Sequence, residues 1–278
     1  MKCEIEMVKA IFVVGTGRSG THFLCRSLGG FRNVVDPLKG HENAPILRQI
    51  ALSAIHHHQL PNRVIEYYEK AKMKLGPKDV FLDQHHPNIF FFDNLLSVFE
   101  DILFLCPRRP LVQVVASMLQ HNGALSWIDY AKESYKRQNA DSCSSVSRLY
   151  TEFSSKEPVP MPNQFLGVTG WQQLFEADLY LLCAFRVLSH YQTMSRLQSR
   201  DSRCRFLGYE NLINTPENEL KSVFSADELE QLGQFEMKEK VDKAPLSKFR
   251  SVLTADQINR LEEIESEFDR NQYIPQLM

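Results

Sequence analysis

The chain has 278 residues, 43% of them hydrophobic, which is enough for one large domain, and no low-complexity segment divides residues 1–278 in two. Its 32 basic and 34 acidic residues leave a net charge of −2, which excludes nucleic-acid binding through bulk electrostatics. Any site for an anion must therefore be local.

Residues 10–28 (AIFVVGTGRSGTHFLCRSL) begin with an apolar, β-branched run, pass through a turn rich in glycine, serine and threonine, and open directly into a helical pattern. Gly15, Gly17 and Gly20 would let the backbone approach an oxyanion closely. The first turn of the helix would add unpaired N–H groups and the positive end of its dipole. The expected guest of this turn is phosphate or sulfate.

The turn differs from the loop of nucleoside triphosphatases in where it places its cation. The spacing from Gly15 to Gly20 matches that loop, but Thr21 and His22 stand where the motif requires Lys and then Ser or Thr. The cation lies instead at Arg18, inside the turn.

The later elements alternate between strands and helices. Strands are predicted at residues 33–36, 79–83, 101–106 and 203–208, and helices at 42–59, 61–75, 88–100, 111–121 and 171–197, with a mostly helical chain from 215 onward and a loop at 241–248. This alternation indicates an α/β fold with a central parallel β-sheet flanked by helices, whose ligands bind beyond the carboxyl ends of the strands. The Ser-rich and then Pro-rich segment 139–167 is expected to be either a lid or a disordered loop.

A second anion anchor follows the buried strand at 101–106. Arg108 and Arg109 come directly after it, and Ser117 lies on the next helix. Arginine forks match the geometry of phosphate, and a serine adds a neutral donor. A basic helix start at the surface is the alternative interpretation.

Taken in chain order, these strings resemble the sulfotransferase family. GxxRSGTxxL after a strand resembles the family's 5′-phosphosulfate loop, and Arg-x-Pro followed by a serine resembles its 3′-phosphate segment. The resemblance implies a P-loop NTPase-like sulfotransferase fold and the donor 3′-phosphoadenosine 5′-phosphosulfate (PAPS), with adenosine 3′,5′-bisphosphate (PAP) as product. Residues implied to bind the 5′ end of the donor are Gly17, Arg18, Ser19, Gly20, Thr21 and His22.

For the 3′-phosphate, the resemblance leaves two arginines open. Arg108 fits the Arg-x-Pro pattern, whereas Arg109 has the family's spacing of eight residues to Ser117.

Two later segments carry further resemblances. FLGYENLINTPENEL, at residues 206–220, resembles the family's Tyr-Glu-x-Leu segment and implies that Tyr209 approaches the adenine. LSKFRSVLTADQINRLEE, at residues 246–263, weakly resembles a basic-aromatic segment, which makes Lys248 and Arg250 candidate phosphate contacts.

Transfer also requires a base that takes a proton from the acceptor. Glu42, in KGHENAP, is the preferred candidate, and His85 or His86, in LDQHHPN, is the alternative. A dipole-stabilising Glu and a solvated histidine pair are the structural explanations of the same residues. The consecutive histidines 56–58 are expected at the surface, because neighbours on a helix cannot all face one metal.

No metal is expected, because the strand at 101–106 runs into Pro107 and not into an aspartate that could complete a magnesium site. Six widely spaced cysteines without a Cys-x-x-Cys pair indicate reduced thiols and a cytoplasmic location. The N-terminal run that follows Glu4 and Glu6 is too short and too acidic for a signal peptide, and no later run approaches a membrane span, so no membrane partner is expected.

The predicted function is transfer of a sulfuryl group from PAPS to a hydroxyl or amine of a small metabolite, as in natural-product tailoring. Family resemblance offers a guanidinium alkaloid of the saxitoxin type as one acceptor, which Glu42, Asp129 and Glu133 could recognise. The alternatives are a P-loop kinase and a non-catalytic nucleotide-binding relative.

Overall fold

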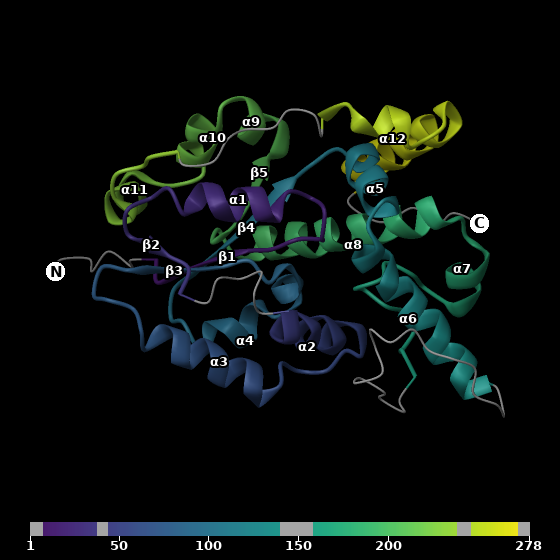
Figure 1. The fold of residues 1–278 in the computed structure, drawn as a ribbon, viewed down its shortest axis with the longest axis horizontal. Helices are drawn as coiled ribbons and strands as arrows, with labels where there is room; N and C mark the ends of the chain where they lie inside the picture. Colours follow the sequence, from purple (N-terminus) through teal and green to yellow (C-terminus); the bar gives the residue numbers. More distant parts are fainter. Residues whose placement is uncertain (1–7, 38–43, 140–157, 238–245, 272–278) are drawn as a thin grey trace.

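Five parallel strands form the sheet at the centre of the computed structural model, which describes residues 8–37, 44–139, 158–237 and 246–271 (Figure 1). The strands are β1 (Ala10–Val13), β2 (Val34–Val35), β3 (Val80–Asp83), β4 (Ile102–Arg108) and β5 (Cys204–Gly208). Their order is β2-β3-β1-β4-β5, and every pairing is parallel. The predicted α/β class with a central parallel sheet is confirmed.

The apolar runs form strands because both faces of the sheet are covered. Side chains alternate between the faces along a strand, so Ala10 and Phe12 point to one core and Ile11 and Val13 to the other. All four are fully buried, which explains why the sequence shows a continuous apolar run where a half-exposed strand would alternate.

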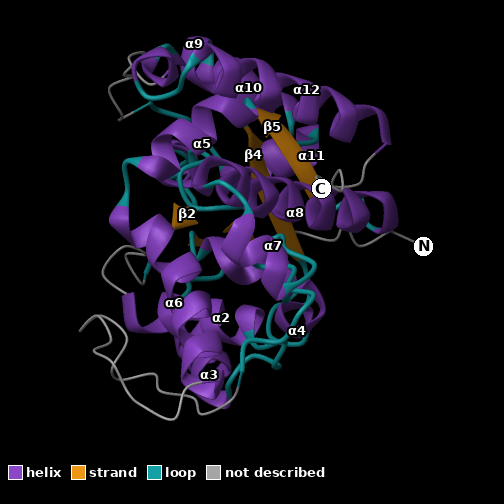
Figure 2. Cartoon of the chain, turned by 90° about the vertical axis from the view of Figure 1, so that its right-hand side faces the viewer, coloured by secondary structure: helices purple, strands orange, loops and turns teal. Residues whose placement is uncertain are grey.

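Helices cover the sheet in two sets, which Figures 1 and 2 show from two sides. The Ile11 side holds α1 (Thr21–Leu28), α9 (Tyr209–Asn214), α10 (Pro216–Ser222) and α11 (Ala226–Leu232). The Phe12 side holds α2 (Ala44–Ile55), α3 (Asn62–Lys72), η2 (His86–Phe90), α4 (Phe92–Leu96), α5 (Leu111–Leu119), α6 (Asn122–Asn139), α7 (Trp171–Glu176), α8 (Leu179–Arg200), η5 (Lys248–Ser251) and α12 (Ala255–Asn271).

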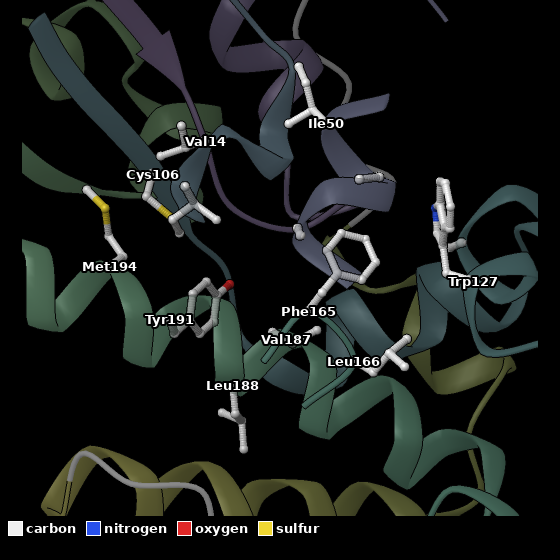
Figure 3. Packing of buried hydrophobic residues seen from close by; sticks show 14 of the residues in the cluster. Val14, Ile50, Cys106, Trp127, Phe165, Leu166, Val187, Leu188, Tyr191 and Met194 are labelled. Atoms are coloured by element: carbon white, nitrogen blue, oxygen red, sulfur yellow. The ribbon is translucent and has the colours of Figure 1, made fainter. Parts of the chain in front are cut away.

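Helix α8 packs against the carboxyl end of β4 and holds its backbone in place. Figure 3 shows Tyr191 of α8 close to Cys106 of β4. The Tyr191 hydroxyl accepts a hydrogen bond from the backbone N–H of Arg109 at 3.1 Å and donates one to the carbonyl of the same residue at 3.0 Å. A buried side chain thus fixes the backbone where the chain leaves the strand.

Two predicted helices are interrupted in the structure. The segment predicted as one helix at 88–100 holds the short helices η2 and α4, because Phe91 between them has a non-helical φ of −129° that lets Ile89 and Phe92 both reach the core. The segment 171–197 is divided at Ala177, where ψ is 143°. Because α7 packs on α6 while α8 runs under the sheet, a single straight helix would lose one of these contacts.

Part of the Pro-rich segment belongs to the core. Val159, Phe165 and Leu166 are 0–2% exposed, and the Asn163 side chain donates a hydrogen bond to the Ile55 carbonyl. Residues 140–157 lie outside the described residues.

The histidine run 56–58 corrects a prediction. His57 and His58 are exposed, but His56 is only 7% exposed, and its Nε2 lies 2.9 Å from the Tyr130 hydroxyl. It faces inward because it lies three residues after the buried Ser53, on the same side of the last turn of α2. No helix in the described ranges is long and apolar enough to cross a membrane.

Candidate functional site

A cavity of about 620 Å³ lies beyond the carboxyl ends of the strands. The segment 17–22 follows β1, His86 follows β3, Arg109 follows β4 and Tyr209 follows β5, and residues from all of these line it. This is where parallel α/β sheets bind ligands, and the volume lies in the range of small-molecule sites.

The loop after β1 adopts left-handed backbone conformations at three positions. Gly15 has a φ of 133°, Arg18 of 78° and Gly20 of 108°. A side chain at the position of Gly20 would overlap the Tyr209 ring, so only glycine lets α1 and α9 approach this closely. At Arg18 the conformation costs about 1–3 kcal/mol for a residue with a side chain, which is typical of functional loops.

Helix α1 presents its N-terminus to the loop. Its N-cap is Gly20, which has no side chain to accept hydrogen bonds from the first-turn amides, and the first turn holds no acidic residue. Thr21 and His22 of this turn line the cavity. The arrangement offers backbone donors and the positive end of a helix dipole to an anion.

Ser19 makes its hydrogen bonds within the loop itself. Its side chain is fully buried and does not line the cavity. Its hydroxyl donates to the Thr16 carbonyl at 2.8 Å, and its backbone N–H donates to the same oxygen at 3.3 Å. Ser19 therefore holds the shape of the loop.

Hydrogen bonds join the loop to helix α5. Arg18 Nε donates to Ser117 Oγ at 3.1 Å, and Arg109 Nη1 donates to the Arg18 carbonyl at 3.0 Å. The Arg109 guanidinium also stacks over the Tyr209 ring, 4.5 Å from its centroid. Burial lowers the pKa of Arg109 below its ordinary value, but a guanidinium stays charged at neutral pH. Four residues that the sequence predicted for the site thus lie in contact in one cluster: Arg18, Ser117, Arg109 and Tyr209.

The adjacent arginines are separated by the alternation of the strand. Arg109 is 5% exposed and lines the cavity. Arg108 points to α12, where its Nη2 lies 2.6 Å from Asp269 Oδ1 and its guanidinium stacks over Tyr191, 4.2 Å from the ring centroid. Of the two candidates for the 3′-phosphate, only Arg109 is placed to reach a ligand in this cavity.

Gln113 is a site residue that sequence reasoning missed. Its Oε1 accepts from Arg109 Nε at 3.1 Å, and its Nε2 donates to Glu210 Oε1 at 3.1 Å. It lies in the first turn of α5, directly after Arg109 and the N-cap Pro110, and this place at the start of the helix that follows β4 is the signal that could have identified it.

The two candidate histidines differ in their surroundings. His85 is 1% exposed, with Nδ1 2.6 Å from Asp83 Oδ1, and it does not line the cavity. His86 lines the cavity, and burial, followed by the charges of Arg186 and His190, holds its pKa well below the usual range. The His86 imidazole is therefore neutral near pH 7.

Asp83 is an aspartate at a strand end that the sequence interpretation overlooked. Its Oδ2 accepts from the His85 backbone N–H at 2.9 Å and from Asn88 Nδ2 at 3.0 Å. Its carboxylate is thus occupied by neighbouring donors, and no group of three or more metal-ligating side chains occurs in the described part of the chain.

The three remaining candidate residues, Lys248, Arg250 and Glu42, differ in their position relative to the cavity. Lys248 lines the cavity. Arg250 is exposed, outside the lining, with its guanidinium over the Phe249 ring. Glu42 lies outside the described residues.

Acidic residues that were candidates for a cationic acceptor lie elsewhere. Asp129 is exposed, Glu133 lies 2.9 Å from Lys136 Nζ, and neither lines the cavity. The lining contains several residues that the sequence interpretation did not select: Arg26, Leu47, Arg48, His121, Trp127 and Arg186. These come from α1, α2, α6 and α8 and the turn before α6, so their meeting depends on the tertiary fold.

The fold is that of solved sulfotransferase domains. The sulfotransferase domain from the curacin biosynthetic pathway matches with a TM-score of 0.52 at 12% identity, over 94% of this chain and 99% of that one. A sulfotransferase from Alicyclobacillus acidocaldarius (TM-score 0.46, 13% identity, 93% and 96% covered) and the sulfotransferase domain of the Synechococcus PCC 7002 olefin synthase (0.46, 14%, 95% and 98%) also match. No family model matches the sequence, and no curated protein does.

Proposed function

We propose that this chain is a PAPS-dependent sulfotransferase that transfers a sulfuryl group to a hydroxyl or amine of a small-molecule acceptor. One observation carries the proposal: Arg18 lies in a glycine turn at the N-terminus of α1 and is hydrogen-bonded to Ser117, while Arg109 binds its carbonyl. This is a two-part anion cradle on the fold of a sulfotransferase domain.

The residues fit a nucleotide with an anionic group at each end. The first-turn amides of α1, Arg18 and Thr21 would hold the 5′ end. Arg109, Ser117 and Lys248 would hold the 3′-phosphate, and Tyr209 would lie beside the base. The missing side chain at Gly20 leaves room for the Tyr209 ring to lie against the loop.

The donor supplies an activated sulfuryl group, and the chain stabilises charge and moves one proton. Arg18 and the loop amides would stabilise the negative charge that develops on the leaving phosphate oxygen. His86 is the proposed base among the described residues, because it lines the cavity and is neutral near pH 7. Glu42 stays the alternative base. His85 would act only through its neighbours, because it is buried against Asp83.

We also propose a cytoplasmic location, which the state of the thiols supports. The described cysteines Cys25, Cys106, Cys183 and Cys204 are all free and buried. A small metabolite in a natural-product tailoring step is the proposed acceptor, but a saxitoxin-type cation meets no carboxylate of the described residues in the cavity lining.

Calorimetric titration tests the proposal against its rivals. PAP without magnesium is expected to bind with a dissociation constant in the range of about 1–10 µM, and ATP with magnesium is expected to bind more weakly. A preference for ATP with magnesium would indicate a kinase. Binding of PAP without transfer from PAPS to any acceptor in a broad panel would indicate a non-catalytic relative.

A further inference from the structure

The cavity lining is strongly cationic. The charged side chains that line it among the described residues are Arg18, Arg26, Arg48, Arg109, Arg186 and Lys248. No aspartate or glutamate from the described ranges joins them. The donor site proposed above uses Arg18, Arg109 and Lys248, so half of the cations lie beyond it.

Arg48 is the most informative of these additional cations. It lies on α2 and is half-buried. Ala44, one turn earlier on the same helix face, and the adjacent Leu47 also line the cavity, whereas Ile46 and Ile50 pack into the core. In the described part of the chain, the Arg48 side chain makes no hydrogen bond or ion pair.

The wall around Arg48 is otherwise largely apolar. Leu47 from α2 and Ala124 and Trp127 from α6 line the cavity, and Trp127 is 9% exposed. None of these residues belongs to the donor site, which is built from the loop after β1, Arg109 after β4, and the elements α1, α5, α9 and η5. An arginine fork beside an aromatic and an aliphatic surface matches a ligand that combines an apolar body with a carboxylate or phosphate.

We propose, on the basis of the function proposed above, that the acceptor is an anionic molecule. It carries its reacting hydroxyl or amine on an aromatic or aliphatic body that packs between Leu47 and Trp127. A carboxylate or phosphate on the same molecule binds the Arg48 guanidinium. This replaces the cationic acceptor expected from the sequence, because every Arg, Lys, Asp or Glu side chain in the described lining is a cation.

The experiment compares ligands that share a 4-hydroxyphenyl body and differ in the charged or neutral group opposite the hydroxyl, in protein saturated with PAP so that the donor site is filled. The probes are 4-hydroxyphenylacetate, 4-hydroxybenzylphosphonate, 4-hydroxyphenylacetamide and tyramine, titrated by calorimetry. We expect at least one of the two anions to bind roughly tenfold or more tightly than the neutral amide, and tyramine to bind most weakly. Equal affinities, a preference for tyramine, or no binding of either anion would overturn the proposal.

Three variants locate the anion. Arg48→Gln is expected to remove the preference for the anion without changing the affinity for the amide, and Arg48→Lys to retain part of it, because an ammonium keeps the charge but lacks the fork. Arg63→Gln, the same charge change on the exposed face of α3, serves as the matched control and is expected to bind like the original protein. An unchanged preference in Arg48→Gln would exclude Arg48 as the anion's partner.

A second readout uses the chain's two tryptophans. In a Trp171→Phe variant, fluorescence reports on Trp127 alone, and the anions are expected to change it. Saturating the protein with PAP before the titration separates the two proposals. Failure to bind PAP contradicts the proposed function, whereas PAP binding without an anion preference contradicts only the inference about the acceptor.

Discussion

At the scale of single residues, Arg18 combines a strained backbone with the central charge of the cradle. We expect Arg18→Ala to lower the rate of sulfuryl transfer by about 100- to 1,000-fold, the usual effect of losing one oxyanion donor. The free energy of unfolding should hardly change, because alanine inherits the same left-handed φ of 78°. Single-turnover kinetics and urea-induced unfolding measure the two effects.

Arg18→Gly is the matched comparison, because glycine adopts the left-handed conformation without strain. It should be as inactive as Arg18→Ala and at least as stable. A near-normal transfer rate in either variant would remove Arg18 from the mechanism.

The adjacent arginines are expected to separate binding from stability. Arg109→Ala should weaken PAP binding by roughly 10- to 100-fold, because a charged hydrogen-bond donor is lost from a buried site. Arg108→Ala should leave the affinity for PAP within about threefold, because its guanidinium binds Asp269 and Tyr191 on the far side of β4. Its free energy of unfolding should fall by about 1 kcal/mol, as expected for an exposed ion pair with a cation–π contact. Calorimetry with PAP would contradict this assignment if Arg108→Ala had the larger effect.

The sequence identified many residues of the cavity but could not orient them. Gly17, Arg18, Gly20 and Thr21 were accessible to sequence reasoning because a strand, a turn and a helix follow one another without interruption. The choice between adjacent arginines depends on which face of β4 each side chain meets. Arg48 was inaccessible because α2 reaches the cavity only through tertiary packing.

At the scale of elements, α9 packs its Tyr209 ring directly against Gly20, the N-cap of α1. Gly20→Ala is expected to displace the Tyr209 ring and to lower the free energy of unfolding by about 1–3 kcal/mol, because the new side chain overlaps the ring and φ is 108°. The affinity for PAP should fall with it.

Gly170→Ala is the control, because a side chain there meets no atom within 4 Å. It should change neither the unfolding midpoint in urea nor the affinity for PAP. Equal stability of the two variants would show that the contact between Gly20 and Tyr209 is not tight in solution.

Periodicity predicted the strands better than the helices. The strands at 79–83 and 203–208 lie within one residue of β3 and β5, because turn residues bound short, largely apolar runs. Helix α6 was not predicted as an element, and the break at Ala177 was not predicted either. The two extended residues between α7 and α8 leave the spacing of apolar residues on either side unchanged. The break therefore becomes visible only in the packing of α7 against α6.

At the scale of the whole molecule, buried histidines make stability depend on pH. Burial lowers the pKa of His190 to about 3 and holds that of His86 well below its usual range. In the unfolded chain both would titrate near about 6.5, so the unfolded chain binds more protons as the pH falls below that value. The free energy of unfolding should be level above about pH 6.5 and decrease below it, by up to about 1.4 kcal/mol per pH unit for each group.

Urea-induced unfolding at about pH 7.5 and about pH 5.5 measures this effect. His190→Gln is expected to flatten the pH dependence, whereas His58→Gln, at an exposed position, should leave it unchanged. Constant stability between the two pH values would contradict neutral burial of His86 and His190.

The strand order has a consequence for biosynthesis. Strand β1 is made first but lies at the centre of the sheet, where Ala10 pairs with Phe81 on one side and Ile102 on the other. Until β3 has left the ribosome this apolar strand has no partner on either edge, and until β4 follows it still lacks a partner on one edge, a condition that favours aggregation of nascent chains and recruitment of chaperones. A fragment of residues 1–100 should therefore aggregate and pellet on centrifugation under conditions in which the complete chain stays in the supernatant. The time needed to synthesise β4 would set how long the nascent chain is prone to aggregate.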